Sequence, residues 1–244
     1  NRSTYAEGRK VRNSRDQRAM GKRSRHGRER DEQHWKSAEA DIIYRLHAAG
    51  VRVPKPYAFV EGVLVMECIV GPEGGPAPRL AECTLEPAHA REICLQLIRE
   101  VVRMLCADIV HGDLSLFNVL LEEEGPVVID FPQAINAAQN RNAKKILLRD
   151  VANLTSGLMR GVPTEQLRFA HEMWALYEAG ELRPDTDITG RFDLPRHEVD
   201  AERLLRQMIE VEEDEAIADE NAEYQFHPPQ RARVVALPDP GDAI

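Results

Sequence analysis

Apolar residues recur at helical spacing in five stretches of the chain. They fall on one face every three or four residues from Glu32 to Ala49 and, most strongly, from Ala90 to Leu105, and each run predicts an amphipathic helix. The same spacing predicts three more helices, over about 142–160, 164–179 and 197–217. Most of the helical pattern therefore lies in the second half of the chain.

Strand patterns are short. Tyr57–Val60 and Val63–Glu67 flank a Glu-Gly pair, which is typical of a two-residue hairpin. Val119–Leu121 and Val127–Ile129 predict a second hairpin, closed by a turn at Glu122–Gly125. Because small antiparallel strands come before most of the helices, the order of elements predicts an α+β fold.

Composition narrows the class of protein. The chain has 244 residues, 43% of them hydrophobic, which is enough for one sizeable domain or a compact two-lobed one. No run approaches the roughly 18 consecutive apolar residues of a membrane-spanning helix, and no signal-peptide pattern is present, so we expect no membrane partner. The four cysteines form no CxxC pair. Their spacing excludes a disulfide scaffold or a zinc ribbon and is typical of a protein of the reducing cytoplasm.

The net charge of −9 is unevenly distributed. Residues 1–30 carry 11 Lys or Arg against 3 acids, a local net charge of +8 that leaves −17 for the rest. Such a basic segment suits contact with RNA or a ribosome; alternatively, it forms a solvated, flexible loop. Residues 210–223 carry eight acids and no base, and we expect them to lead into an acidic, Pro-rich tail.

Three polar side chains are placed for phosphoryl-transfer chemistry. Asp113 lies in a predicted loop, Asp108–Asn118, where a carboxylate can face a cleft rather than the core. Asn118 stands at the mouth of the second hairpin and Asp130 follows its last strand, so the hairpin brings the two together. Their oxygens suit Mg²⁺, while Asp113 would orient an attacking hydroxyl. The alternative is that Asp113 and Asn118 cap turns and that His111 is a core histidine.

The sequence motifs of this region resemble those of a known family. His111 opens the word HGDLS and Ile129 opens the word IDFPQ, and both resemble the catalytic and metal-binding loops of the RIO family of atypical protein kinases. Ordinary Ser/Thr kinases have Lys in place of the Ser in the first word and Gly in place of Pro-Gln in the second. Three shorter words fall where RIO sequences have similar ones: VPKP from Val53, VME from Val65 and RDV from Arg149.

The resemblance covers about residues 1–180 and implies a fold. That fold is a bilobal protein-kinase-like one of the α+β class, with a small antiparallel-sheet N-lobe that is incomplete in this chain and a mainly helical C-lobe. The implied organisation is a basic flexible loop at 1–30, the remainder of the N-lobe at 31–70, a helical C-lobe at 71–217 and an acidic, Pro-rich tail at 218–244.

The resemblance also implies a role for residues in both loops. Asp113 would be the catalytic Asp, and Asn118 and Asp130 would bind Mg²⁺. Ser115 would approach a phosphate or a substrate proton. In some RIO proteins the metal-binding Asp itself accepts the phosphoryl group, so Asp130 is also a candidate transient nucleophile.

Nucleotide-binding roles follow in the same way. Glu39 matches the helix Glu that pairs with the ATP-holding Lys, unless it is an ordinary surface Glu. Glu67 and Ile69 would form the hinge and give a backbone C=O and N–H to adenine. Met66 would be the gatekeeper, an ordinary core residue, or both. Asp150 matches an Asp that braces the catalytic-loop backbone.

The implied activity is that of an ATP- and Mg²⁺-dependent phosphotransferase, either a non-specific serine/threonine protein kinase acting on a protein hydroxyl or an ATPase. A Gly-rich loop and a strand Lys are absent before Glu39, and we expect them upstream of Asn1. Two alternatives remain open. One is a small-molecule phosphotransferase of the aminoglycoside or choline sort, which also uses His-Gly-Asp; the other is a nucleotide-switched ribosome- or RNA-associated factor.

Overall fold

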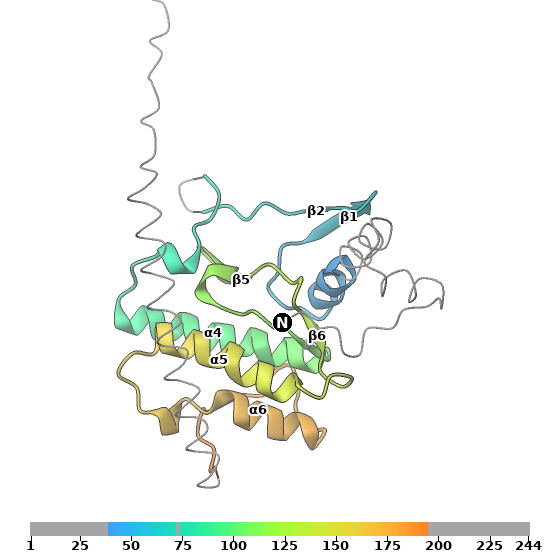
Figure 1. Ribbon diagram of the computed structural model, residues 1–244. Coiled ribbons are helices and arrows are strands. Elements are labelled where there is room, and N and C mark those ends of the chain that lie inside the picture. The colour runs from blue at the N-terminus through green and yellow to red at the C-terminus, as the bar shows by residue number, and fades with distance from the viewer. Residues whose placement is uncertain (1–38, 72–73, 195–244) are drawn as a thin grey trace, which may run out of the picture.

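The computed structural model describes residues 39–71 and 74–194. Residues 39–48 are helical, and Figure 1 shows the elements that follow them. In chain order these are β1 (Pro56–Val60), β2 (Val63–Met66), η1 (Leu80–Glu82), α4 (Pro87–Cys106), β3 (Ile109–Val110), η2 (Leu116–Asn118), β4 (Val119–Glu122), β5 (Gly125–Val128), β6 (Ile135–Asn136), α5 (Ala143–Leu158), η3 (Thr164–Gln166) and α6 (Phe169–Glu178). The basic segment at 1–30, residues 32–38 of the first predicted helix, the helical pattern at 197–217 and the tail at 218–244 lie outside the described residues.

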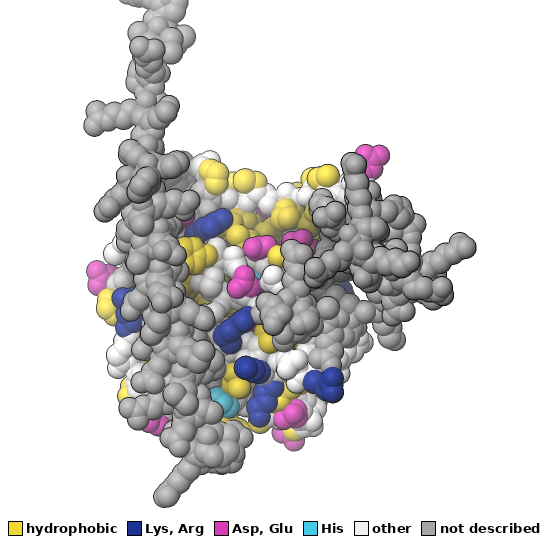
Figure 2. All heavy atoms as spheres, viewed as in Figure 1, with side chains coloured by type: hydrophobic (Ala, Val, Ile, Leu, Met, Phe, Trp, Pro, Cys, Tyr) yellow, Lys and Arg dark blue, Asp and Glu magenta, His cyan; other side chains and the backbone are white. Residues whose placement is uncertain are grey.

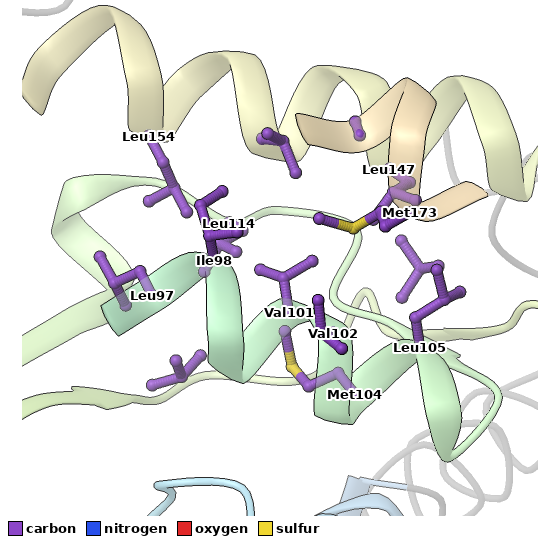
Figure 3. Packing of buried hydrophobic residues seen from close by; sticks show 14 of the residues in the cluster. Leu97, Ile98, Val101, Val102, Met104, Leu105, Leu114, Leu147, Leu154 and Met173 are labelled. Atoms are coloured by element: carbon purple, nitrogen blue, oxygen red, sulfur yellow. The ribbon is translucent and has the colours of Figure 1, made fainter. Parts of the chain in front are cut away.

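Three helices build the main core. In Figure 1, α4, α5 and α6 stack below the hairpins. α4 starts at Pro87, whose fixed φ suits the first helical position, and its apolar face includes Leu97 and Val101. Figure 3 shows these two side chains in one cluster with Leu154 of α5 and Met173 of α6. Each large apolar side chain buried in this way contributes about 1.5–3 kcal/mol to stability. The residues in this cluster are the ones that the helical periodicity placed on apolar faces, so the periodicity predicted this part of the core correctly.

The strands of the described residues form three separate two-stranded antiparallel sheets. β1 pairs with β2 as predicted, with Val60 opposite Val63 across a two-residue turn. β4 pairs with β5, but the predicted turn was too wide, because Glu122 already pairs with Gly125. Gly125 has a φ of 124°, which a residue with a side chain rarely adopts, and this glycine allows the tight turn.

Two short strands lie where the sequence predicted no strand. β3 falls inside the predicted loop 108–118 and pairs with β6, Ile109 opposite Asn136 and Val110 opposite Ile135. Strands of two residues are too short to show an alternating pattern, which is why the sequence did not reveal them.

The helix predicted at 164–179 is also shorter than expected. η3 occupies its first turn and α6 begins only at Phe169. The Arg168 N–H donates to the Gly190 carbonyl oxygen (2.8 Å) instead of continuing the helix. A long-range contact therefore overrides the local periodicity.

All four cysteines are free thiols in the structure. Within 39–71 and 74–194, no helix is both long enough and apolar enough to cross a bilayer.

Candidate active site

The loop that follows β3, residues 111–118 (the Asp113 loop), begins with a buried histidine. The His111 side chain is 1% exposed. Its Nε2 donates to the Ile129 carbonyl oxygen (3.0 Å), and its Nδ1 accepts a hydrogen bond from the Asp113 N–H (3.3 Å). The ring also packs against Phe131, with ring centroids 4.8 Å apart. His111 is thus a satisfied core histidine that ties the Asp113 loop to residues 129–133 (the Asp130 loop).

Helix α5 holds the Asp113 loop from another side. Asp150 is 1% exposed and accepts hydrogen bonds from the Gly112 N–H (2.7 Å) and the Leu114 N–H (3.4 Å). Arg149 donates to the Gly112 carbonyl oxygen, and Asn153 donates to the Leu114 carbonyl oxygen (3.1 Å). The backbone on both sides of the candidate catalytic carboxylate is therefore fixed to the helical core.

Burial shifts the pKa of two groups that organise this loop. It raises the pKa of Asp150 to about 7, although the Arg149 guanidinium and the Gly112 and Leu114 amides oppose the shift. It lowers the pKa of His111 to about 4, with a smaller opposing effect from the hydrogen bond to Ile129. Both shifts have the sign that desolvation of the charged form produces.

We expect His111 to make the protein acid-labile. Because the fold lowers the pKa of His111 from 6.5 to about 4, the unfolded chain binds a proton more readily between these two values. The contribution of His111 to stability is then complete above about pH 6.5, and about 3 kcal/mol is lost as the pH falls through 4. Urea unfolding at a series of pH values from 7 to 4 measures this loss.

The variant His111→Gln is the control for this prediction, because glutamine keeps an N–H donor but does not titrate. Asp150, whose pKa is raised, loses stability as the pH rises over the same range, so only the difference between wild type and variant isolates His111. Equal dependence of the unfolding free energy on pH in both proteins would contradict the expectation.

The β4–β5 hairpin brings Asn118 to the Asp130 loop. The Ile129 N–H donates to the Asn118 carbonyl oxygen (3.0 Å), one step beyond the last pair of the ladder. The Asn118 Nδ2 donates to the Asp113 carbonyl oxygen (2.8 Å), which leaves its Oδ1 available to a ligand. Asp130 is exposed and has a φ of 67°, in the left-handed region that Asp and Asn tolerate better than most residues.

Asp130 acts electrostatically on two further carboxylates. Burial raises the pKa of Glu39 and the charge of Asp130 raises it further, while a hydrogen bond from the Phe131 N–H opposes both. Burial also raises the pKa of Asp113; the Arg149 guanidinium opposes this shift and Asp130 adds to it. No ion pair between described residues involves Glu39 or Asp130. The concentrated negative charge favours a bound cation.

Ser115 lies in the same loop, immediately before η2. Its carbonyl oxygen accepts a hydrogen bond from the Asn118 N–H (3.1 Å). The structure therefore places Asp113, Ser115, Asn118 and Asp130 in one region, as the sequence predicted, with Glu39 near Asp130.

The predicted hinge follows β2. Met66 ends this strand and is 39% exposed, so the reading of Met66 as an ordinary core residue is wrong. The Glu67 N–H donates to the Lys55 carbonyl oxygen (2.9 Å), and Ile69 is buried against Val127 of β5. Among the hydrogen bonds of the described residues, none uses the Glu67 carbonyl oxygen or the Ile69 N–H.

Sequence reasoning missed three contacts of this site. It assigned no role to Arg149 or Asn153, which stand four residues apart on α5 and both hold the Asp113 loop. Their spacing around a buried Asp was the available signal. It also missed the hydrogen bond between Glu39 and the Phe131 N–H, because no local pattern links residues that far apart in sequence.

Small hairpins over a helical core, with one loop braced by a buried Asp and a second loop facing it, define a protein-kinase-like fold. A family model described as the RIO domain matches residues 1–170. The chain therefore belongs to the RIO domain family, and both the resemblance and the fold class expected from the sequence are confirmed.

Several RIO-type proteins are similar to the chain. It is 39% identical over 127 residues to the RIO-type serine/threonine-protein kinase Rio1 of Haloferax volcanii, a match of 52% of this chain and 42% of that protein. It is 35% identical over 127 residues to the human serine/threonine-protein kinase RIO1, 52% of this chain and 22% of that protein. It is 33% identical over 132 residues to Rio1 of Thermoplasma acidophilum, 54% of this chain and 67% of that protein. The chain thus spans less than half the length of the first two relatives.

Proposed function

We propose that this chain carries the phosphotransferase centre of an ATP- and Mg²⁺-dependent serine/threonine protein kinase, or ATPase, of RIO type. One observation carries the proposal: Asn118 is hydrogen-bonded to the Asp113 backbone, and the hairpin sets the Asp130 loop beside it. In this arrangement one carboxylate would orient the acceptor, and two other oxygens would hold a metal ion. The relatives named as serine/threonine-protein kinases support the same reaction class.

The residues present fit a magnesium ion. The Asn118 Oδ1 and the Asp130 carboxylate offer two hard oxygens in negative surroundings, and Mg²⁺ takes few protein ligands when phosphates and water complete its shell. Within the described part of the chain, no group of three or more His, Cys, Asp or Glu side chains is arranged to hold a metal ion, so the proposed site uses only two protein ligands. When bound, Mg²⁺ would neutralise the phosphate charge, and ATP would supply the phosphoryl group.

Asp113 would perform the acid–base work. Its carboxylate would accept a hydrogen bond from the acceptor hydroxyl and take up the proton, and its raised pKa suits this role. Ser115 would contact a phosphate or the acceptor, since it lies two residues further along the same loop. Asp130 is also a candidate to accept the phosphoryl group itself, as in some RIO proteins.

Residues outside the Asp113 loop would hold the nucleotide. The Glu67 carbonyl oxygen and the Ile69 N–H would bind adenine, with Met66 beside them as gatekeeper. Glu39 would pair with the Lys that holds the ATP phosphates. Because Glu39 also accepts a hydrogen bond from the Phe131 N–H, a shift of the Asp130 loop would also move the helix that carries Glu39.

Asp130→Asn is expected to weaken binding of ATP in the presence of Mg²⁺ by about tenfold or more. The replacement removes a charge from the proposed metal site but keeps the shape and the left-handed backbone. Since changes next to metal ligands alone cost about 10–100-fold in metal affinity, loss of a ligand carboxylate costs at least as much. Isothermal titration of the full-length protein with ATP, with and without Mg²⁺, measures the effect.

Asp187→Asn provides the matched control for this measurement, since Asp187 is exposed and takes part in none of the described ion pairs. If Asp130→Asn and Asp187→Asn bind Mg-ATP equally well, Asp130 is not a metal ligand.

The acceptor class is a separate part of the proposal. Incubation with ATP and a casein-like protein, or with ATP and an aminoglycoside or choline, distinguishes a protein kinase from a small-molecule phosphotransferase.

We also propose how the chain is divided and where it acts. The segments 1–30, 31–70, 71–217 and 218–244 are its units, and the protein acts in the cytoplasm. The basic residues 1–30 contact RNA or a ribosome. Salt-insensitive, RNA-free behaviour in cell lysate would count against the RNA contact.

A further inference from the structure

Four basic residues lie in a row along α5, beginning just before its N-terminus and ending beside the Asp113 loop. Arg141, Lys144 and Lys145 are exposed, and Arg149 is partly exposed. Residues 145 and 149 are four apart within α5, a spacing that places side chains on one face of a helix, and Arg141 lies in the turn just before the N-cap Asn142. We call these four residues the α5 basic row. Figure 2 shows dark blue Lys and Arg side chains gathered where α5 runs, just below magenta carboxylates.

The α5 basic row ends at the candidate active site. Arg149 donates to the Gly112 carbonyl oxygen, and its charge acts on the neighbouring Asp113. Lys145 lies one turn earlier, about 6 Å along the axis, and Arg141 lies before the first residue of the helix. Lys144 and Lys145 form no ion pair with any residue of 39–71 or 74–194. The positive end of the α5 dipole adds to the same field.

The surface therefore changes sign over a short distance. The row is positive, whereas Asp113, Asp130 and Glu39 make the reaction site negative. A ligand that fits both parts is uncharged where it meets Asp113 and negative further along α5. An extended peptide advances about 3.3 Å per residue, so the roughly 6 Å between Arg149 and Lys145 corresponds to about two residues, and Lys144 and Arg141 extend the row further along the peptide.

We propose that the α5 basic row binds acidic side chains of a polypeptide acceptor, two to four residues from the hydroxyl that Asp113 orients. This inference rests on the proposed function and names its substrate class. The charge pattern favours a peptide over RNA, because a continuous phosphate backbone would have to pass the three carboxylates. Helix α5 also offers no aromatic side chain on which a base could stack.

The test compares two serine peptides on the full-length protein. One carries Asp or Glu two to four residues from the serine on both sides, and the other carries Asn or Gln at the same positions. Wild type is expected to prefer the acidic peptide by about tenfold in kcat/KM, because several exposed charge pairs act together. Lys144→Glu with Lys145→Glu is expected to bring this ratio close to one, and the corresponding alanine variant is expected to fall between them.

Arg91→Glu with Arg99→Glu is the matched control. Both residues are exposed on α4 and give the same change of charge outside the row, so the ratio should stay at its wild-type value. A wild-type ratio near one, or a ratio that falls equally in both charge-reversed proteins, would overturn the proposal.

A binding measurement separates this proposal from the proposed function. It follows the fluorescence anisotropy of a labelled acidic peptide with Ala in place of Ser. Binding that depends on Lys144 and Lys145 supports the row even if neither serine peptide is phosphorylated, an outcome that would contradict only the kinase activity. Single-stranded RNA that binds through these lysines, while the acidic peptide does not, would overturn the inference.

Discussion

Replacing Asp113 by alanine is expected to lower turnover of the full-length protein about a thousandfold while leaving its affinity for Mg-ATP nearly unchanged. A positioned general base contributes about 10²–10⁴-fold to rate, and the metal-binding oxygens proposed here belong to other residues. The informative result is that turnover falls while the affinity for Mg-ATP is kept. Steady-state kinetics measure the loss of rate, and calorimetric titration with Mg-ATP measures the retained affinity.

The Asp113→Ala protein should fold normally, so a loss of rate will not reflect a damaged loop. The contacts that hold Asp113 are made by its backbone: its N–H donates to His111, and its carbonyl oxygen accepts from Asn118. Alanine keeps both. Asp187→Ala, a change of the same kind at an exposed position, serves as the control. A rate within tenfold of wild type would exclude Asp113 as the catalytic carboxylate.

Asp150→Ala is expected to lower the free energy of unfolding by about 3 kcal/mol and to reduce turnover as well. The change leaves the buried N–H groups of Gly112 and Leu114 without an acceptor and removes one charged partner of Arg149, which also donates to the Gly112 carbonyl oxygen. An unpaired buried donor costs about 1–3 kcal/mol, and breaking a buried pair costs more than an exposed one. Urea denaturation followed by tryptophan fluorescence, to which the buried Trp174 (8% exposed) contributes, measures the change.

Two comparisons define the cause of that loss. Asp150→Asn keeps one acceptor oxygen, so its stability should lie between those of Asp150→Ala and wild type. Asp187→Ala should stay within about 0.5 kcal/mol of wild type, as surface changes usually do. If Asp150→Ala unfolds at the same urea concentration as Asp187→Ala, the hydrogen bonds to the loop contribute little to stability.

The grouping of Asp113, Ser115, Asn118 and Asp130 was predictable because these residues are close in sequence or joined by a short hairpin. The hairpin of β4 and β5 has a clear strand pattern on each side, so the approach of Asn118 to the Asp130 loop followed from its geometry. Helices α4 and α5 were equally predictable, since each has an apolar face several turns long. Local patterns of this length leave few alternative structures.

The contacts that join distant elements were not predictable from pattern alone. β3 and β6 have two residues each, and their pairing depends on the helical core around them. The start of α6 is set by a hydrogen bond from Arg168 to Gly190. Asp150 was recognised through a family resemblance, but the supporting bonds from Arg149 and Asn153 depend on how α5 docks.

The backbone at Asp130 restricts which residues can replace it during evolution. With a φ of 67°, a residue such as Ala or Glu would strain the turn by roughly 1–2 kcal/mol. Glycine relieves the strain but offers no oxygen, and asparagine keeps an oxygen without the charge. Asn and Gly are therefore the replacements that keep the turn at the smallest cost in strain, and both give up the carboxylate.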